Sequence, residues 1–146
     1  MSRPFKFEAV LNQRQHREET ARKIFADAAR ELRHAQNILS QMESTRARYR
    51  RTMRLKQDNS ESAMELILYS RYLTRIDAEI REQQLFITTL VNDKEDKRSA
   101  LMTTLKDRKA IEKLKERYLA VVDKKARESE QKLLNDVAIS RYQRQQ

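Results

Sequence analysis

Side chains that could catalyse a reaction or hold a metal ion are scattered along this sequence and form no recognised site. The two histidines, His16 and His34, are far apart, whereas zinc motifs on helices place two histidines about four residues apart. The adjacent acids Glu95 and Asp96 have basic neighbours, as on a solvated helix face. A nucleophile elbow needs glycine, which is absent. The sequence therefore predicts no enzyme activity, no metal and no cofactor.

A basic run at residues 46–56 could bind an anionic partner. It holds no acid, and its basic residues are Arg46, Arg48, Arg50, Arg51, Arg54 and Lys56. Three interpretations stay open: helix-dipole compensation and solubility, binding to nucleic-acid phosphates, or docking onto an acidic protein surface, which the interleaved Tyr49 and Met53 favour. Nucleic acid is disfavoured, because a basic zipper needs its basic region as a free helix leading into a parallel dimer.

The composition favours helices joined by a narrow seam. Glycine and cysteine are absent, Pro4 is the single proline, and charged and hydrophobic residues make up 37% and 38% of the chain. This is too little apolar material for a thick core. No stretch approaches the roughly 18 apolar residues of a membrane span, and the N-terminus lacks a signal-peptide core. We expect a soluble cytoplasmic protein that does not insert into a membrane.

A seven-residue repeat runs from Phe7 to Met53 and predicts a helix over about residues 5–56. Its two columns are Phe7, Arg14, Ala21, Ala28, Ala35, Met42, Tyr49 and Leu11, Glu18, Phe25, Leu32, Leu39, Arg46, Met53. Most of these positions are apolar or aromatic. A disordered polycation would share the high charge but not this period.

A polar stretch predicts a turn at about residues 57–61, with Ser60 or Ser62 capping a second helix over about 62–142. The repeat resumes in the columns Leu66, Leu73, Ile80, Ile87 and Tyr69, Ile76, Gln83, Leu90. It weakens at 92–98 and returns through Leu101, Leu105, Ile111, Leu114, Tyr118 and Val121. The weak stretch predicts a bend or a stutter.

Folding the chain back at this turn gives the predicted fold: all-α, a long antiparallel two-helix coiled-coil hairpin, with residues 1–146 as a single domain. Paired positions then have numbers that sum to about 121, so Arg14 lies near Asp107, which could neutralise it. Tyr49 lies near Tyr72, and Tyr72 either closes the edge of the seam or contacts a partner. Residues beyond about 118 form an unpaired overhang.

Five segments, in this order and at this chain length, resemble the FliJ family of the bacterial flagellar type III export apparatus. They are residues 5–14, Tyr49 with Arg50, residues 69–73, residues 108–117 and residues 128–138. The resemblance covers nearly the whole chain. It implies an asymmetric antiparallel coiled coil similar to the central stalk of rotary ATPases, needed for flagellum biogenesis and hence for motility and chemotaxis.

The resemblance also implies partners. The joined chain ends of such proteins insert into the hexameric flagellar export ATPase and promote its assembly and activity. By position, the ATPase-pore residues are Phe7, Leu11, Lys106, Lys109, Lys113 and Arg117. A second patch, for the membrane-embedded export gate protein, is Met42, Tyr49, Tyr72, Ile76 and Gln83. The chain departs from the family pattern at Thr45 and Glu79. Export chaperones are further implied partners, and the implied location is peripheral, at the cytoplasmic face of the inner membrane.

Two other classes of function remain alternatives. One is a nucleic-acid-binding basic coiled coil, which salt-dependent retention on DNA would favour. The other is a self-assembling scaffolding rod, which growth of the particle with concentration would favour.

Overall fold

The computed structural model describes residues 3–59 and 62–145, and these form two long helices and no strand. Helix α1 comprises Glu8–Asp58, and helix α2 comprises Ala63–Gln145. The all-α hairpin prediction is confirmed. Helix α1 begins and ends slightly later than the predicted 5–56, and α2 continues past the predicted end at 142.

Both helices begin with groups that suit a helix N-terminus. Acidic residues stand in each first turn, Glu8 in α1 and Glu65 in α2, where they complement the helix dipole. Ser62 directly precedes α2, and its carbonyl accepts the N–H of Leu66 at 3.2 Å. The alternative cap, Ser60, and part of the predicted turn lie outside the described residues. At the other end of the turn, helix α1 extends to Asp58.

The chain divides into two compact units, which we call the middle unit, Thr20–Leu101, and the terminal unit, Met1–Glu19 with Met102–Gln146. Each unit contains a part of both helices. The single-domain organisation stays a prediction.

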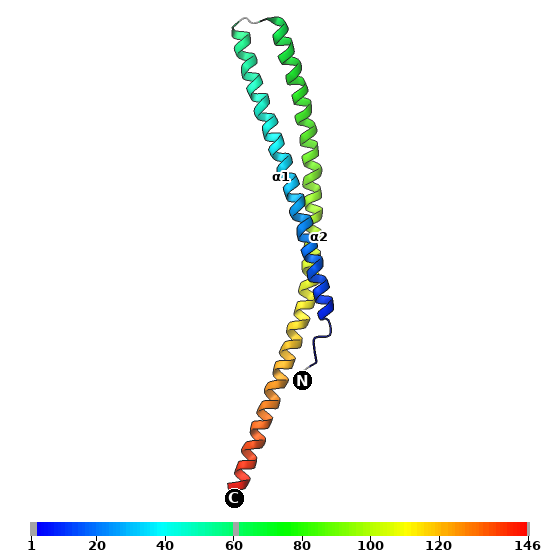
Figure 1. Cartoon of the computed structure of the whole chain (residues 1–146), viewed down its shortest axis with the longest axis vertical. Coiled ribbons are helices and arrows are strands. Elements are labelled where there is room, and N and C mark those ends of the chain that lie inside the picture. The colour runs from blue at the N-terminus through cyan, green and yellow to red at the C-terminus, as the bar shows by residue number, and fades with distance from the viewer. Residues whose placement is uncertain (1–2, 60–61, 146) are drawn as a thin grey trace. The chain divides into compact units, whose positions relative to one another are not determined.

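In the middle unit, α1 and α2 run alongside each other in opposite directions (Figure 1). Leu32, Ala35 and Leu90 pack together, with Ile87 against them. The buried hydrophobic side chains are Ala28, Leu32, Ala35, Ile76, Ile80 and Leu90, and all belong to the predicted columns. The side-chain amide of Gln83 also donates a hydrogen bond across the seam to the Ala35 carbonyl, at 2.9 Å. The predicted antiparallel register is confirmed in this unit.

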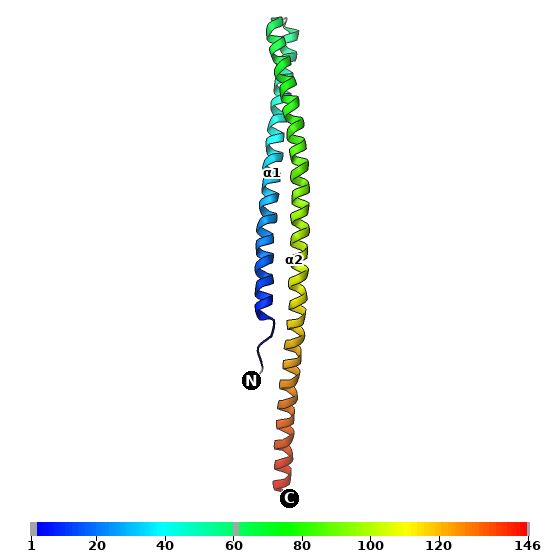
Figure 2. The same cartoon turned by 90° about the vertical axis from the view of Figure 1, so that its right-hand side faces the viewer.

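In the terminal unit, Leu11 and Ile111 are buried, and the ring of Phe5 lies 5.6 Å from that of Tyr118. Arg14 does lie beside Asp107, but its guanidinium donates to the backbone carbonyl of that residue at 2.8 Å, so the expected charge neutralisation is not what holds it. Beyond Val122, every described residue of α2 is exposed, and Figure 2 shows this part of α2 extending past the start of α1. The predicted overhang is confirmed.

The inward-facing residues of α2 in the terminal unit differ in part from those predicted. Leu114 and Val121, expected in the seam, are exposed. Ile111 is buried and Leu105 and Tyr118 are half-buried, as predicted. Four further half-buried positions share the three- and four-residue spacing: Thr104, Arg108, Lys115 and Val122. Long basic side chains can occupy seam positions because their methylene stems pack while the charge reaches water. Hydrophobicity alone therefore missed the seam positions that hold basic or polar residues, and wrongly placed Leu114 and Val121 there.

Basic side chains in the seam also explain why the repeat weakens at residues 92–98, in the middle unit. Lys94 and Lys97 are half-buried, and they continue the spacing that Ile87 and Leu90 begin. The Lys94 ammonium lies 5.9 Å from the ring centroid of Phe25, within reach of a cation–π interaction. The helix is continuous here, so the charges hide the repeat without ending it.

Truncation of a seam residue should cost much more stability than truncation of an equally apolar exposed residue. We expect Ile80→Ala to lower the free energy of unfolding by about 2–4 kcal/mol, because Ile80 is almost fully buried. Leu119→Ala, on an exposed leucine, is the matched control and should change it by less than about 0.5 kcal/mol. Urea unfolding followed by circular dichroism measures both. Equal losses would contradict the assignment of the seam.

Candidate partner-binding site

The middle unit carries an aromatic cluster that both helices build. The ring of Tyr49, on α1, lies 4.4 Å from that of Tyr72 and 5.8 Å from that of Tyr69, both on α2. All three side chains are half-buried. Phenol rings that stack at the edge of a seam keep part of their surface in water, where a partner can cover it. The predicted approach of Tyr49 to Tyr72 is confirmed.

The remaining members of the predicted gate patch differ in exposure. Met42 is half-buried, like the tyrosines. Ile76 is only 5% exposed, so it packs in the seam and offers almost no surface to a partner. Gln83 uses its amide to bond the Ala35 carbonyl. The accessible surface of the patch is therefore carried by the half-buried Met42, Tyr49, Tyr72 and Gln83. The binding role of all five residues stays a prediction.

The basic run is divided between ion pairs and solvent. Arg46 and Arg50 both approach the carboxylate of Asp77, at 3.2 and 3.7 Å. Lys56 pairs with Glu65 at 3.1 Å. These cations stabilise the pairing of α1 with α2 and are not free anion-binding groups.

The other cations of the run lie on the outer side of α1. Arg48 lies over the ring of Tyr49, with 5.8 Å from the guanidinium carbon to the ring centroid. Arg51 and Arg54 are exposed and line an open groove with Ala47 and Arg50. The sequence did not distinguish this outer set from the inner one, since the acids that pair with the inner set belong to the other helix.

The terminal unit presents a second basic surface. The four predicted cations are all exposed, and their spacing of three and four residues places them on one face of α2: Lys106, Lys109, Lys113 and Arg117. Phe7, predicted beside them, is partly exposed and packs edge-on against Phe5. Leu11, predicted at the same site, is 3% exposed and belongs to the seam.

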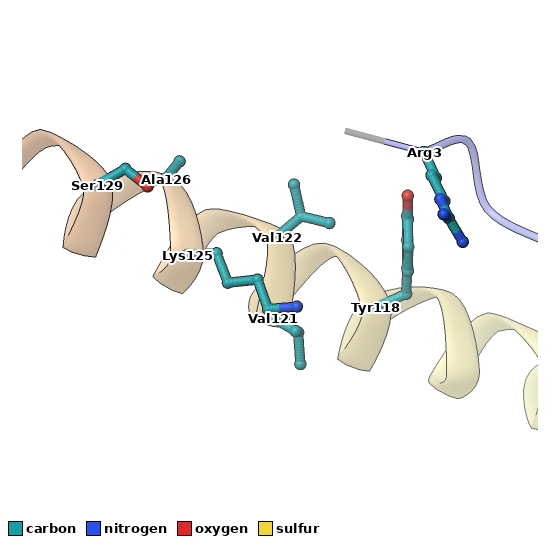
Figure 3. A pocket seen from close by; sticks show the side chains of 7 residues that line it. All are labelled: Arg3, Tyr118, Val121, Val122, Lys125, Ala126 and Ser129. Atoms are coloured by element: carbon teal, nitrogen blue, oxygen red, sulfur yellow. The ribbon is translucent and has the colours of Figure 1, made fainter. Parts of the chain in front are cut away.

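An open hollow next to this surface was not expected from the sequence. Figure 3 shows Arg3, from the N-terminal segment, near Tyr118, with Val121, Val122, Lys125, Ala126 and Ser129 along α2. The α2 residues repeat at three- and four-residue intervals, which could have indicated one continuous face. The hollow lies where α1 has not yet begun, so α2 has only the N-terminal segment beside it.

A buried charge also lies in the seam of the terminal unit. Glu18 is 6% exposed, and its carboxylate accepts a hydrogen bond from the Arg108 guanidinium. Arg108 also pairs with Glu112, at 2.6 Å. The hydrogen bonds to Glu112 and then to Glu18 raise the pKa of the Arg108 guanidinium above its ordinary value. The sequence placed Glu18 in the seam but did not identify Arg108 as its partner.

The sequence of the chain matches one protein family along almost its whole length. The family model described as "Flagellar FliJ protein" matches residues 2–146. The chain belongs to the FliJ family. Membership gives it a role in flagellar protein export. Neither the curated proteins nor the solved structures contain a match to the chain.

In residues 3–59 and 62–145, no group of three or more histidines, cysteines or acids is placed to hold a metal ion. Over the same residues, no helix combines the length and the apolar character that crossing a membrane would require. The features that stand out are exposed side chains on continuous helix faces.

Tyr72 and Ile76 should respond differently to truncation, although both belong to the predicted gate patch. We expect Ile76→Ala to lower the free energy of unfolding by about 2–4 kcal/mol, as for other buried seam residues. Tyr72→Ala loses a partly exposed ring contact and should cost about 1 kcal/mol. Thermal and urea unfolding of the two single variants measure the difference. A loss at Tyr72 as large as that at Ile76 would mean that Tyr72 is a core residue.

Proposed function

We propose that this FliJ-family protein is a coiled-coil stalk of the flagellar export apparatus, with no catalytic activity of its own. Its joined chain ends insert into the hexameric export ATPase and promote the assembly and activity of that enzyme. It also links the ATPase to the membrane-embedded export gate and to export chaperones. In this proposal it acts in the cytoplasm, peripherally at the inner face of the inner membrane.

The observation that carries the proposal is the exposed basic face of the terminal unit. Lys106, Lys109, Lys113 and Arg117 form a row beside the unpaired end of α2. A row of flexible cations can meet acidic loops around a pore without a fixed rotational position, since ammonium and guanidinium groups on long side chains adapt their geometry. A stalk inside a ring of six subunits needs this tolerance.

The aromatic cluster of the middle unit supports the contact with the export gate. Tyr49 and Tyr72 stack with part of each ring in solvent, and Arg48 lies against the first of them. Tyrosine and arginine are enriched among the residues that contribute most to binding at protein interfaces. Family membership supports export chaperones as partners, and it is the sole support for them.

Nucleic-acid binding is the weaker candidate. The basic run that suggested it directs Arg46, Arg50 and Lys56 to acids on α2. Fewer of its cations are then available to replace counterions along a phosphate backbone.

Charge reversal on the basic face should abolish stimulation of the ATPase. The variant combines Lys106→Glu, Lys109→Glu, Lys113→Glu and Arg117→Glu. All four residues are exposed, so helicity by circular dichroism should stay unchanged. We expect ATP hydrolysis by the purified export ATPase to fall to its rate without the stalk, because like charges then face the acidic loops.

A matched control reverses four other exposed cations: Arg17, Lys23, Arg33 and Arg81. It makes the same change in net charge and should keep most of the stimulation. If both variants stimulate equally, the basic face is not the surface that the ATPase contacts.

Loss of the Tyr72 ring should weaken binding to the export gate and reduce motility. We expect Tyr72→Ala to lower the affinity for the purified cytoplasmic part of the gate by about tenfold or more, as for an aromatic anchor. Leu119→Ala, on an exposed leucine of the terminal unit, is the control and should bind normally. Calorimetric titration and swimming assays measure the effect. Normal gate binding by folded Tyr72→Ala would remove Tyr72 from the site.

A further inference from the structure

The side of α2 that faces away from α1 in the middle unit carries large apolar side chains. Ile67 and Leu68 are 52% and 59% exposed, and Leu85 and Phe86 are 69% and 46% exposed. Met64 lies on the same side and is also exposed. None of these residues belongs to the predicted gate patch or to the basic run. We call this surface the outer face.

The two apolar pairs of the outer face are related by a simple spacing. Ile67 and Leu85 are eighteen residues apart, as are Leu68 and Phe86, which is about five turns of helix. Both pairs therefore point in the same direction, about 27 Å apart along α2. Between them, on the same side, lie the exposed residues Arg71, Arg75, Ala78 and Glu82.

The outer face is complementary to the outer face of a second copy that runs in the opposite direction. If a second copy of α2 lies antiparallel, with the two-fold axis at the height between positions 76 and 77, Ile67 and Leu68 pack against Leu85 and Phe86 of the other copy, with Ile67 nearest Leu85 and Leu68 nearest Phe86. The same operation places Arg71 opposite Glu82. One symmetry operation thus matches both apolar pairs and one pair of opposite charges, and each match occurs twice, as in an isologous interface.

The residues near the two-fold axis fit this arrangement. Arg75 would face Ala78, whose small side chain lets the two helices approach closely. Arg75 also has an ion pair within its own chain, with Glu79 at 3.3 Å. Arg71 and Glu82, in contrast, have no ion pair among the described residues, so each would gain a partner from the second copy.

We infer that the outer face of α2 binds a second copy of this chain, in an antiparallel, two-fold symmetric dimer. A second copy is favoured over another partner because the apolar and charged positions complement each other under one operation, which binding to a different protein would not require. The contact is limited to one helix face per copy, so association is weak and depends on concentration. The inference goes beyond the proposed stalk function and does not depend on the ATPase or the gate.

Sedimentation of the full chain over a range of concentrations tests the apolar part of the interface. We expect a reversible monomer–dimer equilibrium for the unaltered protein. Ile67→Glu with Leu68→Glu should weaken the dimer by about tenfold or more, since it places charge against apolar groups. Leu133→Glu with Leu134→Glu is the matched control, because those leucines are also adjacent and are 64% and 57% exposed. It should leave the equilibrium unchanged.

A charge exchange tests the antiparallel symmetry itself. Arg71→Glu alone and Glu82→Arg alone should each weaken the dimer, because like charges then meet twice across the axis. An equimolar mixture of the two variants should associate again, since the glutamate introduced at 71 then faces the arginine introduced at 82. Each residue is exposed, so circular dichroism should report unchanged folding.

The outcomes are distinct. Recovery of association in the mixture, with an unaffected leucine control, supports the dimer. A protein that stays monomeric at all concentrations, a control that disrupts association equally, or a mixture that does not recover would each overturn it.

Discussion

The structure depends on a seam that only two helices share. Each helix can cover a single stripe of the other, so few side chains are fully shielded: among the described residues, the buried hydrophobic ones are Leu11, Ala28, Leu32, Ala35, Ile76, Ile80, Leu90 and Ile111. The described residues form these two helices and no further layer. Most of the remaining surface is exposed helix face, and function has to be carried by patterns of side chains on those faces.

The narrow seam contains charged residues, and these help to specify how the two helices align. Ala28 and Ala35 allow close approach of the helices, while Glu18 with Arg108 and Lys94 over Phe25 occupy positions that a uniform coiled coil would fill with leucine. An ion pair in a seam contributes little net stability, but a shifted register would leave its buried charge unpaired. The polar positions therefore help to select one alignment among the many that a seven-residue repeat permits.

The sequence predicted the fold well and the surfaces less well, for a physical reason. The columns that contain Leu32 and Ile80 are apolar and are buried, so periodicity found them. In the terminal unit, Leu114 is exposed while Lys115 is half-buried, because a long basic side chain can bury its stem. Burial is a property of both helices together, and hydrophobicity describes one residue at a time. The outer face of α2 lies outside the heptad columns, so the seven-residue repeat did not indicate it.

The exposed end of α2 has mainly local contacts. From Asp123 to Gln145 every side chain is exposed, and stabilising contacts in this segment are local, such as the ion pair of Asp123 with Arg127 at 2.8 Å. Local pairs of this kind contribute only about 0.2–0.5 kcal/mol each, and helices in proteins take most of their stability from packing of an apolar face. Apolar residues such as Leu133 and Leu134 gain nothing there without a cover. Burial by a partner would stabilise the helix and the complex together.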